Sequence, residues 1–315
     1  MSRVLITGGA GFLGSHLCNH ELLQGNNVFC LDDLSCSTGE NIRPFLHHKN
    51  FHFINEDVRD PSFYLSDIDR IFHLACPASP EWYSRDPIKT LTTSVIGTKN
   101  MLDLANKTGA RMLFTSTSEV YGDPEIHPQP ESYNGNVSIT GIRACYDEGK
   151  RAAETLCADY ERTTNVDIRV VRLFNTYGPN MAANDGRVVS NFITQALANK
   201  PITIYGDGLQ TRSFCYVGNM INMLYLVMNN AKNFGPMNLG NADEFTIKEL
   251  AELISALTGY DQFEYRPIPQ DDPKVRKPNL DKMFNCLNLD RGFFDYTDLK
   301  QGVQSTIDYF KGRVS

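Results

Sequence analysis

A glycine-rich segment near the N-terminus constrains the fold of this 315-residue chain more than any other feature. Its sequence is Gly8-Gly9-Ala10-Gly11-Phe12-Leu13-Gly14, and it joins a predicted strand, Arg3–Thr7, to a predicted helix over residues 15–24. Gly8, Gly11 and Gly14 permit a tight turn, close approach of the backbone to a pyrophosphate, and close packing of helix on strand. The helix N-terminus stabilises negative charge. A glycine-rich turn alone is common, but its placement between strand and helix predicts a dinucleotide site.

Further apolar runs alternate with helical patterns along the first half of the chain, which is typical of a doubly wound parallel sheet. We expect a Rossmann-type α/β fold, with residues 1–175 forming the cofactor domain and 176–315 mainly forming a smaller mixed α/β substrate lobe interleaved with it. The predicted strands are 3–7, 27–31, 51–55, 71–75, 112–117 and 167–173, and the other predicted helices are 146–164, 188–199, 246–257 and 299–311.

Acidic residues follow the second and third predicted strands. Asp32 and Asp33 end the second, at the distance expected for carboxylates that accept hydrogen bonds from the adenosine ribose. A carboxylate there repels a 2′-phosphate, so the pattern favours NAD over NADP, with Asp32 as the main acceptor and Asp33 assisting. Asp57 follows the third strand and is a candidate for contacting adenine, although a surface turn is an alternative interpretation.

Charge and composition exclude several classes of protein. A net charge of −7 argues against a nucleic-acid surface. The eight cysteines form no C-x-x-C pair, which argues against a zinc site, and we predict no metal. No apolar run approaches the roughly 20 residues needed to span a bilayer, and no signal peptide is recognisable at the N-terminus, so we expect a cytoplasmic protein without a membrane segment.

Catalytic candidates lie in a Y-x-x-x-K pair, Tyr146 and Lys150, whose spacing places both side chains on one face of a helix. A neighbouring ammonium and an oxidised nicotinamide favour the phenolate, which can then take a proton from a sugar hydroxyl. The preceding predicted strand ends in Thr117-Ser118-Glu119. Thr117 can hydrogen-bond the reacting hydroxyl and Glu119 offers a carboxylate near the sugar, although solvated polar residues at a strand end are the alternative interpretation.

With these motifs the chain resembles the NAD-dependent epimerase/dehydratase family of extended short-chain dehydrogenases/reductases, from Val4 to the last predicted helix. Within this family it is most similar to the UDP-glucuronate decarboxylases, or UDP-xylose synthases. The resemblance is carried by residues 73–80 (HLACPASP), 116–124 (STSEVYGDP), 143–151 (RACYDEGKR) and 184–192 (NDGRVVSNF). The similar 4,6-dehydratases carry Asp-Glu after the strand-end threonine, whereas this chain has Ser118-Glu119 as the decarboxylases do.

The resemblance implies NAD-dependent oxidation at C4 of UDP-glucuronate, loss of carbon dioxide from the resulting β-keto acid, and reduction at C4 to UDP-xylose. Tyr146, Lys150, Thr117 and Ser118 would act at the reacting centre. Glu119 would orient the sugar acid or relay a proton, and Arg276 would contact the reacting end or the diphosphate. The remaining expected cofactor contacts are Phe12, Leu13, Val58, Leu74, Thr93 and Thr176. The other expected substrate contacts are Pro77, Asn175, Arg187 and Arg212.

Some positions depart from the family pattern. Thr92, Ser94 and Ala182 stand where similar enzymes often have lysine, asparagine and histidine. The resemblance also implies a homodimer built from a four-helix bundle, with the helix after Pro87 and the helix that carries Tyr146 as contributors. A 4,6-dehydratase, a 4-epimerase and a non-catalytic NAD-binding protein stay open as alternatives, as does UDP against dTDP in the substrate.

Overall fold

The computed structural model describes residues 1–60, 65–230, 232–268 and 275–313. Its centre is a seven-stranded parallel sheet in the order β11-β6-β5-β4-β1-β2-β3. The strands are β1 (Arg3–Thr7), β2 (Asn27–Leu31), β3 (Phe51–Ile54), β4 (Arg70–His73), β5 (Arg111–Thr117), β6 (Ile168–Leu173) and β11 (Met237–Leu239). The strand order reverses between β1 and β4, and ligands of open α/β sheets bind at such a point, outside the carboxyl ends of the strands.

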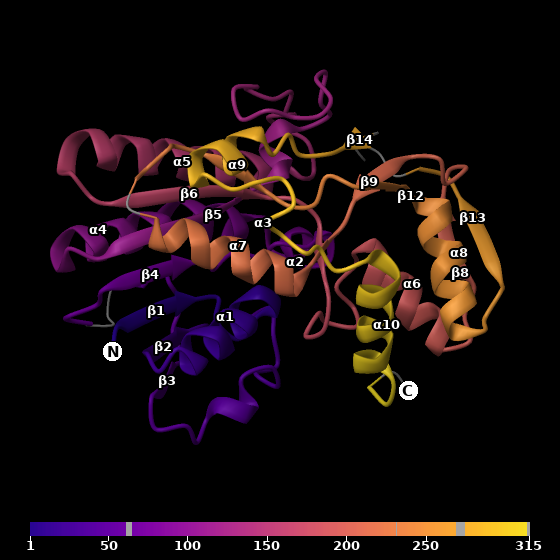
Figure 1. Cartoon of the computed structure of the whole chain (residues 1–315), viewed down its shortest axis with the longest axis horizontal. Helices are drawn as coiled ribbons and strands as arrows, with labels where there is room; N and C mark the ends of the chain where they lie inside the picture. Colours follow the sequence, from indigo (N-terminus) through magenta and orange to yellow (C-terminus); the bar gives the residue numbers. More distant parts are fainter. Residues whose placement is uncertain (61–64, 231, 269–274, 314–315) are drawn as a thin grey trace.

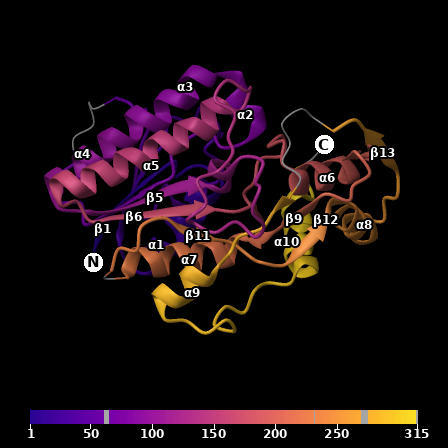
Figure 2. The ribbon, with the colours of Figure 1, turned by 90° about the horizontal axis from the view of Figure 1, so that it is seen from above.

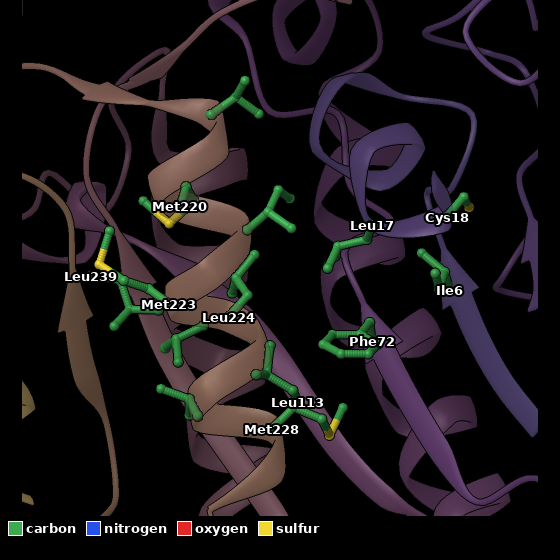
Figure 3. Close-up of a cluster of buried hydrophobic side chains, with 14 of the residues drawn as sticks. Ile6, Leu17, Cys18, Phe72, Leu113, Met220, Met223, Leu224, Met228 and Leu239 are labelled. Carbon is green, nitrogen blue, oxygen red and sulfur yellow. The ribbon is translucent and has the colours of Figure 1, made fainter. Parts of the chain in front are cut away.

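Helices cover both faces of the sheet (Figure 2). One face carries α1 (Phe12–Leu23), α7 (Val217–Asn229) and α9 (Asp281–Leu287), and the other carries α3 (Pro87–Thr92), η2 (Thr93–Gly97), α4 (Thr98–Thr108) and α5 (Ala144–Thr164). The side chains alternate accordingly, because Val4 and Ile6 of β1 face α1 and α7 while Leu5 faces α4 and α5. Figure 3 shows Leu17 of α1 and Leu224 of α7 within the first of these two layers.

A second lobe lies beyond the carboxyl ends of the strands (Figure 1). Its hydrophobic core joins α6 (Val188–Leu197), α8 (Ile247–Thr258) and α10 (Leu299–Phe310) to β8 (Ile202–Tyr205), with Ile193, Leu250 and Val303 fully buried at its centre. The remaining elements are η1 (Arg43–Phe45), α2 (Pro80–Arg85), η3 (Ser118–Tyr121), β7 (Thr176–Tyr177), β9 (Thr211–Ser213), β10 (Cys215–Tyr216), β12 (Glu244–Thr246), β13 (Phe263–Arg266) and β14 (Val275–Arg276).

The predicted fold class is confirmed, and the six predicted strands and five predicted helices all occur. Five strand bounds differ from the prediction by one or two residues: β3 ends at Ile54 and β4 at His73, whereas β4 begins at Arg70, β5 at Arg111 and β6 at Ile168. Sequence analysis missed α7 and the seventh strand β11, which return from the second half of the chain to the sheet. We keep the division near residue 175 as a proposal, with this return as the interleaving.

Candidate active site

A cavity of about 1440 Å³ opens between the carboxyl edge of the sheet and the second lobe. Every residue that sequence analysis predicted for catalysis, cofactor or substrate lines it. These residues are Gly8, Gly11, Phe12, Leu13, Gly14, Asp32, Asp33, Asp57, Val58, Leu74, Pro77, Thr93, Thr117, Ser118, Glu119, Tyr146, Lys150, Asn175, Thr176, Arg187, Arg212 and Arg276. Their roles stay predictions, but the fold brings them to one place.

The glycine loop leaves a cradle that side chains would fill. Gly8 has φ of +69°, and a Cβ built at Gly14 would lie 2.1 Å from the carbonyl oxygen of Gly8. At Gly11 the corresponding Cβ would lie 3.2 Å from the same oxygen. Thr93 lines the cavity too, and its buried hydroxyl has no hydrogen-bond partner among the described residues. The exposed loop backbone and this unpaired donor fit a dinucleotide, so these residues would hold NAD.

Three aspartates, Asp32, Asp33 and Asp57, line the cavity at the end where we predict the adenosine half of such a cofactor. Asp32 accepts hydrogen bonds from the backbone N–H groups of Ala10 at 3.0 Å and Leu34 at 2.9 Å. Burial raises the pKa of Asp32, although these N–H donors oppose the shift. The carboxylate therefore ties the second strand to the glycine loop, and its place in the cavity leaves it able to accept from a ribose.

The other two aspartates have cationic partners that sequence analysis did not single out. Lys89 of α3 donates to Asp33 at 2.6 Å. Asp57 pairs with Arg59 at 2.6 Å, and Arg59 also donates to the Thr92 hydroxyl at 3.0 Å. The expected contact of Asp57 with adenine is thus in competition with an ion pair.

Tyr146 is buried at the first turn of α5, and its ring stacks on that of Tyr83, with centroids 5.4 Å apart and planes 10° apart. Burial and the nearby thiol of Cys76 raise its pKa above the ordinary tyrosine value. A hydrogen bond with Thr117 acts in the opposite direction. The neutral phenol is therefore favoured in this state of the site, and its deprotonation has to accompany a change in the charges around it.

Lys150 lies one turn further along α5 and is also buried. Its ammonium donates to the carbonyl of Thr115 at 2.8 Å and sits 4.8 Å from the centroid of the Phe114 ring. Burial lowers the pKa of Lys150. The spacing of the pair thus brings Tyr146 and Lys150 to the carboxyl end of β5, where Thr117 is the last strand residue.

Glu119 is held by two arginines at the end of this strand. Arg276 of β14 binds it through both guanidinium ends, with one contact at 2.9 Å, and Arg143 at the start of α5 binds the same carboxylate. Burial alone would raise the pKa of Glu119, but the two guanidiniums outweigh it and the pKa is lowered. The charge of Arg212 acts in the same direction. Glu119 is therefore a carboxylate at neutral pH and not a proton donor.

A second acid, Asp147, is buried behind Arg143, with 7% of its surface exposed. Its nearer oxygen lies 3.9 Å from the Arg143 guanidinium, and its other oxygen has no hydrogen-bond partner in the described part of the chain. Burial, together with the negative charge of Glu119, raises the pKa of Asp147 to about 7. Glu119 and Asp147 thus both lie beside Arg143, but Glu119 is ionised at neutral pH whereas Asp147 is partly protonated.

The second lobe supplies the far end of the cavity. Arg187 pairs with Asp185 at 3.2 Å, whereas Arg212 donates to the carbonyl of Thr211 at 2.9 Å. The second lobe also lines the cavity with aromatic and polar side chains that suit a flat base and its polar edge. None of them was assigned from the sequence: Phe192, Gln195, Thr203, Tyr205, Gln210 and Phe214. Gln195 donates to the Thr203 hydroxyl at 3.1 Å and accepts from its N–H at 3.0 Å, which fixes both side chains.

Sequence analysis also gave no role to Tyr83, Cys76 or Arg143. Arg143 stands within the 143–151 motif, three residues before Tyr146, so its helical proximity to the tyrosine was a usable signal. Of the departures from the family pattern, Ser94 bonds Cys76 at 3.1 Å and Ala182 lines the cavity.

Within residues 1–60, 65–230, 232–268 and 275–313, no group of three or more His, Cys, Asp or Glu side chains is placed to hold a metal ion. Nor is any helix in that part of the chain long and apolar enough to cross a membrane.

Comparison with known proteins gives consistent matches. The sequence profile of the NAD dependent epimerase/dehydratase family matches residues 4–240. UDP-glucuronic acid decarboxylase 4 of Arabidopsis thaliana is 49% identical over 99% of this chain and 69% of its own length. UDP-glucuronic acid decarboxylase 1 of Danio rerio is 48% identical over 98% of this chain and 72% of its own length. UDP-glucuronic acid decarboxylase 3 of Arabidopsis thaliana is 48% identical over 99% of this chain and 90% of its own length.

Solved structures agree on the fold. UDP-glucose 4-epimerase of Thermotoga maritima, determined with UDP-glucose, superposes with a TM-score of 0.89 at 27% identity, covering 99% of this chain and all of the other. The dTDP-glucose 4,6-dehydratase DesIV of Streptomyces venezuelae, determined with NAD, gives 0.88 at 24% identity over 98% of this chain and 97% of the other.

Proposed function

Because the chain belongs to the NAD dependent epimerase/dehydratase family, we propose that it is an enzyme that converts UDP-glucuronate to UDP-xylose and carbon dioxide. The main support for decarboxylation over the other reactions of the family is the ionisation of Glu119. Two arginines keep this carboxylate ionised beside Thr117 and Tyr146. Removal of water from a sugar needs an acid to protonate the leaving hydroxyl. Loss of carbon dioxide from a β-keto acid needs none, so Ser118 and an ionised Glu119 suit decarboxylation.

NAD held by the glycine loop would supply the hydride acceptor for oxidation at C4 of the sugar and the hydride donor for its later reduction. As the hydride leaves, Tyr146 takes the proton of the C4 hydroxyl, while Thr117 holds that hydroxyl and Lys150 stabilises the phenolate through its charge. The product is a 4-keto sugar acid. The C5–C6 bond then breaks, carbon dioxide leaves, and the electron pair forms an enolate across C4 and C5.

A proton from solvent is then added at C5, and Tyr146 returns its proton to the C4 oxygen when the hydride comes back. Glu119 keeps Arg276 and Arg143 in place, and these guanidiniums orient the sugar acid and its developing enolate charge. The overall reaction consumes one proton and leaves the cofactor unchanged. Asn175, Arg187 and Arg212 would bind the diphosphate, as guanidinium forks suit phosphate oxygens.

The test is to incubate the purified protein with NAD and UDP-glucuronate, follow the nucleotide sugar by NMR, and trap the released carbon dioxide. We expect UDP-xylose and carbon dioxide in equal amounts without net NADH, and no turnover by Tyr146→Phe. UDP-galacturonate without carbon dioxide would instead identify a 4-epimerase. Parallel incubations with dTDP-glucuronate, UDP-glucose and dTDP-glucose decide the base and the 4,6-dehydratase alternative.

We propose further that the protein is a homodimer in which α3 and α5 of each subunit form a four-helix bundle. The support is a row of exposed apolar side chains on α3 and η2: Ile88 is 76% exposed, Leu91 40% and Ile96 44%. Burial of this row against a second copy would stabilise the dimer. Sedimentation equilibrium at micromolar concentration is expected to give twice the chain mass, and Ile88→Glu is expected to give the monomer mass.

Location in the cytoplasm is also proposed. All eight cysteines are free thiols in the structure, and such thiols are typical of proteins in a reducing compartment. Fractionation of cells that carry the tagged protein at its native level is the test, and recovery with secreted or membrane fractions would reject the location.

A further inference from the structure

The ion pair between Lys89 and Asp33 lies in the wall of the cavity and has no part in the proposed chemistry. The ammonium of Lys89 is 2.6 Å from the carboxylate of Asp33, and the two side chains are 24% and 26% exposed. Asp86 caps α3 by accepting from the N–H of Lys89 at 2.9 Å, so the backbone from which the lysine extends is fixed. Both residues line the same cavity as the glycine loop.

Asp33 accepts hydrogen bonds from two neighbouring residues, Lys89 and Ser35. Besides the lysine, it accepts from the N–H of Ser35 at 3.0 Å and from the Ser35 hydroxyl at 2.7 Å. Burial opposes its ionisation, yet the hydrogen bonds from Lys89 and Ser35 lower the pKa of Asp33. The carboxylate is therefore ionised at neutral pH, and its charge cancels that of the lysine at short range.

The neighbouring ion pair differs in one respect. Arg59 is also neutralised by an aspartate, Asp57, but only Asp57 of that pair lines the cavity. Of Lys89 and Arg59, Lys89 is thus the one whose side chain lines the cavity, at the end where we expect the adenosine ribose. Without its partner, a partly buried ammonium there would attract an anionic group strongly, because a 2′-phosphate carries about two negative charges at neutral pH.

We propose that Lys89 is a masked phosphate-binding residue, and that its ion pair with Asp33, in addition to the Asp32 carboxylate, keeps this site selective for NAD over NADP. The proposal rests on the use of NAD and does not depend on which sugar is the substrate. In it, Asp33 has two effects: its own charge repels a 2′-phosphate, and it neutralises the lysine that would otherwise bind one. The two effects can be separated by substituting the partners one at a time and together.

The experiment measures binding of NADH and NADPH by nicotinamide fluorescence, without sugar, to the full-length protein and to Asp33→Asn, Lys89→Met and the double variant. We expect Asp33→Asn to tighten NADPH binding at least about tenfold, the effect of one favourable short-range charge contact. NADH binding should not tighten, since NADH lacks the 2′-phosphate, and should weaken to the extent that the Asp33 carboxylate assists Asp32 at the adenosine ribose. The double variant should lose the gain for NADPH. Lys248→Met, which removes a lysine from an exposed ion pair on α8, is the matched control and should leave both affinities unchanged.

Two results would overturn the proposal. An equal gain for NADPH in the double variant would mean that removal of the negative charge is sufficient and that Lys89 has no role. No gain in Asp33→Asn, with NADH still bound, would mean that Asp32 alone sets the selectivity. Should Asp33→Asn fail to fold, Lys89→Met gives an independent answer, because it is expected to weaken residual NADPH binding at low salt and to leave NADH binding intact. Unchanged NADPH binding in Lys89→Met would also count against the proposal.

Discussion

The aromatic rings of Tyr146 and Tyr83 lie face to face, with centroids 5.4 Å apart and planes 10° apart. Tyr83 comes from α2 and is almost fully buried, so it forms a fixed surface against which the phenol of Tyr146 rests. A general base must be held within hydrogen-bond reach of its proton, and a rigid neighbouring ring restricts the tyrosine to that position. We therefore expect Tyr83 to act as a positioning residue in the proposed reaction.

Replacement of this ring should lower turnover more than binding. For Tyr83→Leu we expect a fall in kcat of about 10- to 100-fold with KM changed less than threefold, the pattern of a misplaced catalytic group. Tyr83→Phe keeps the stacked ring and should stay close to the parent enzyme. Steady-state kinetics with UDP-glucuronate, with thermal unfolding as a folding check, measures both. Equal kcat values for the leucine and phenylalanine variants would remove the positioning role.

A second prediction concerns Arg143, which pairs with Glu119. Loss of the guanidinium in Arg143→Met removes a positive charge from beside the carboxylate, so the pKa of Glu119 should rise. The acid limb of the kcat profile should therefore move to higher pH, and kcat at pH 7 should fall about tenfold or more. Arg162→Met, which breaks an exposed pair with Asp159 on the same helix, is the control and should keep the parent profile. An unshifted acid limb in Arg143→Met would show that Glu119 does not titrate in the reaction.

The local motifs could be interpreted from the sequence, and the contacts between them could not. The glycine loop and the Tyr146–Lys150 pair are local patterns with fixed geometry, so their elements were predicted. The pairing of Glu119 with Arg276 joins residues 157 positions apart, and only the fold brings them together. Sequence analysis proposed both near the sugar but did not pair them.

The missed elements have physical explanations as well. In α7 the buried residues include Met223, Leu224, Val227 and Met228, so apolar side chains cover much of its circumference and the contrast that reveals a surface helix is weak. The strand β11 has only three residues, too few for a strand pattern. Lys89 was missed because a lone lysine in a helix is usually a solvated surface charge.

Substitution of Gly14 tests whether the glycine loop forms the binding site for the cofactor. A Cβ there would meet the carbonyl oxygen of Gly8 at 2.1 Å and the Cα of Gly9 at 2.6 Å, and neither backbone atom can move without opening the turn. Gly14→Ala should lower the free energy of unfolding by about 2 kcal/mol or more and weaken NADH binding at least about tenfold. Gly292→Ala, where a Cβ would meet nothing within 4 Å, should change unfolding by less than about 0.5 kcal/mol. Urea unfolding and NADH fluorescence titration measure these effects, and normal NADH binding by Gly14→Ala would reject the cradle.

Asp147 should make stability depend on pH in a defined direction. Burial and the charge of Glu119 raise the pKa of Asp147 to about 7, above the value of about 4 expected in the unfolded chain. The folded state therefore binds this proton more tightly than the unfolded state does. Its stabilising contribution is fully present below about pH 4 and is lost as pH rises through 7. Above pH 7 the folded protein contains an ionised, poorly paired carboxylate.

Asp147→Asn removes this loss, since an amide cannot ionise. Relative to the parent protein, the variant should gain stability between pH 5 and pH 8, by on the order of 2 kcal/mol. Urea unfolding of both proteins at pH 5, 6, 7 and 8, without added ligands, measures the difference at each pH. Asp159→Asn, which lies on the same helix but is exposed, should differ from the parent protein by a constant amount. A difference for Asp147→Asn that stays constant, or that shrinks as pH rises, would mean that Asp147 is already ionised at pH 5 and is stabilised by Arg143.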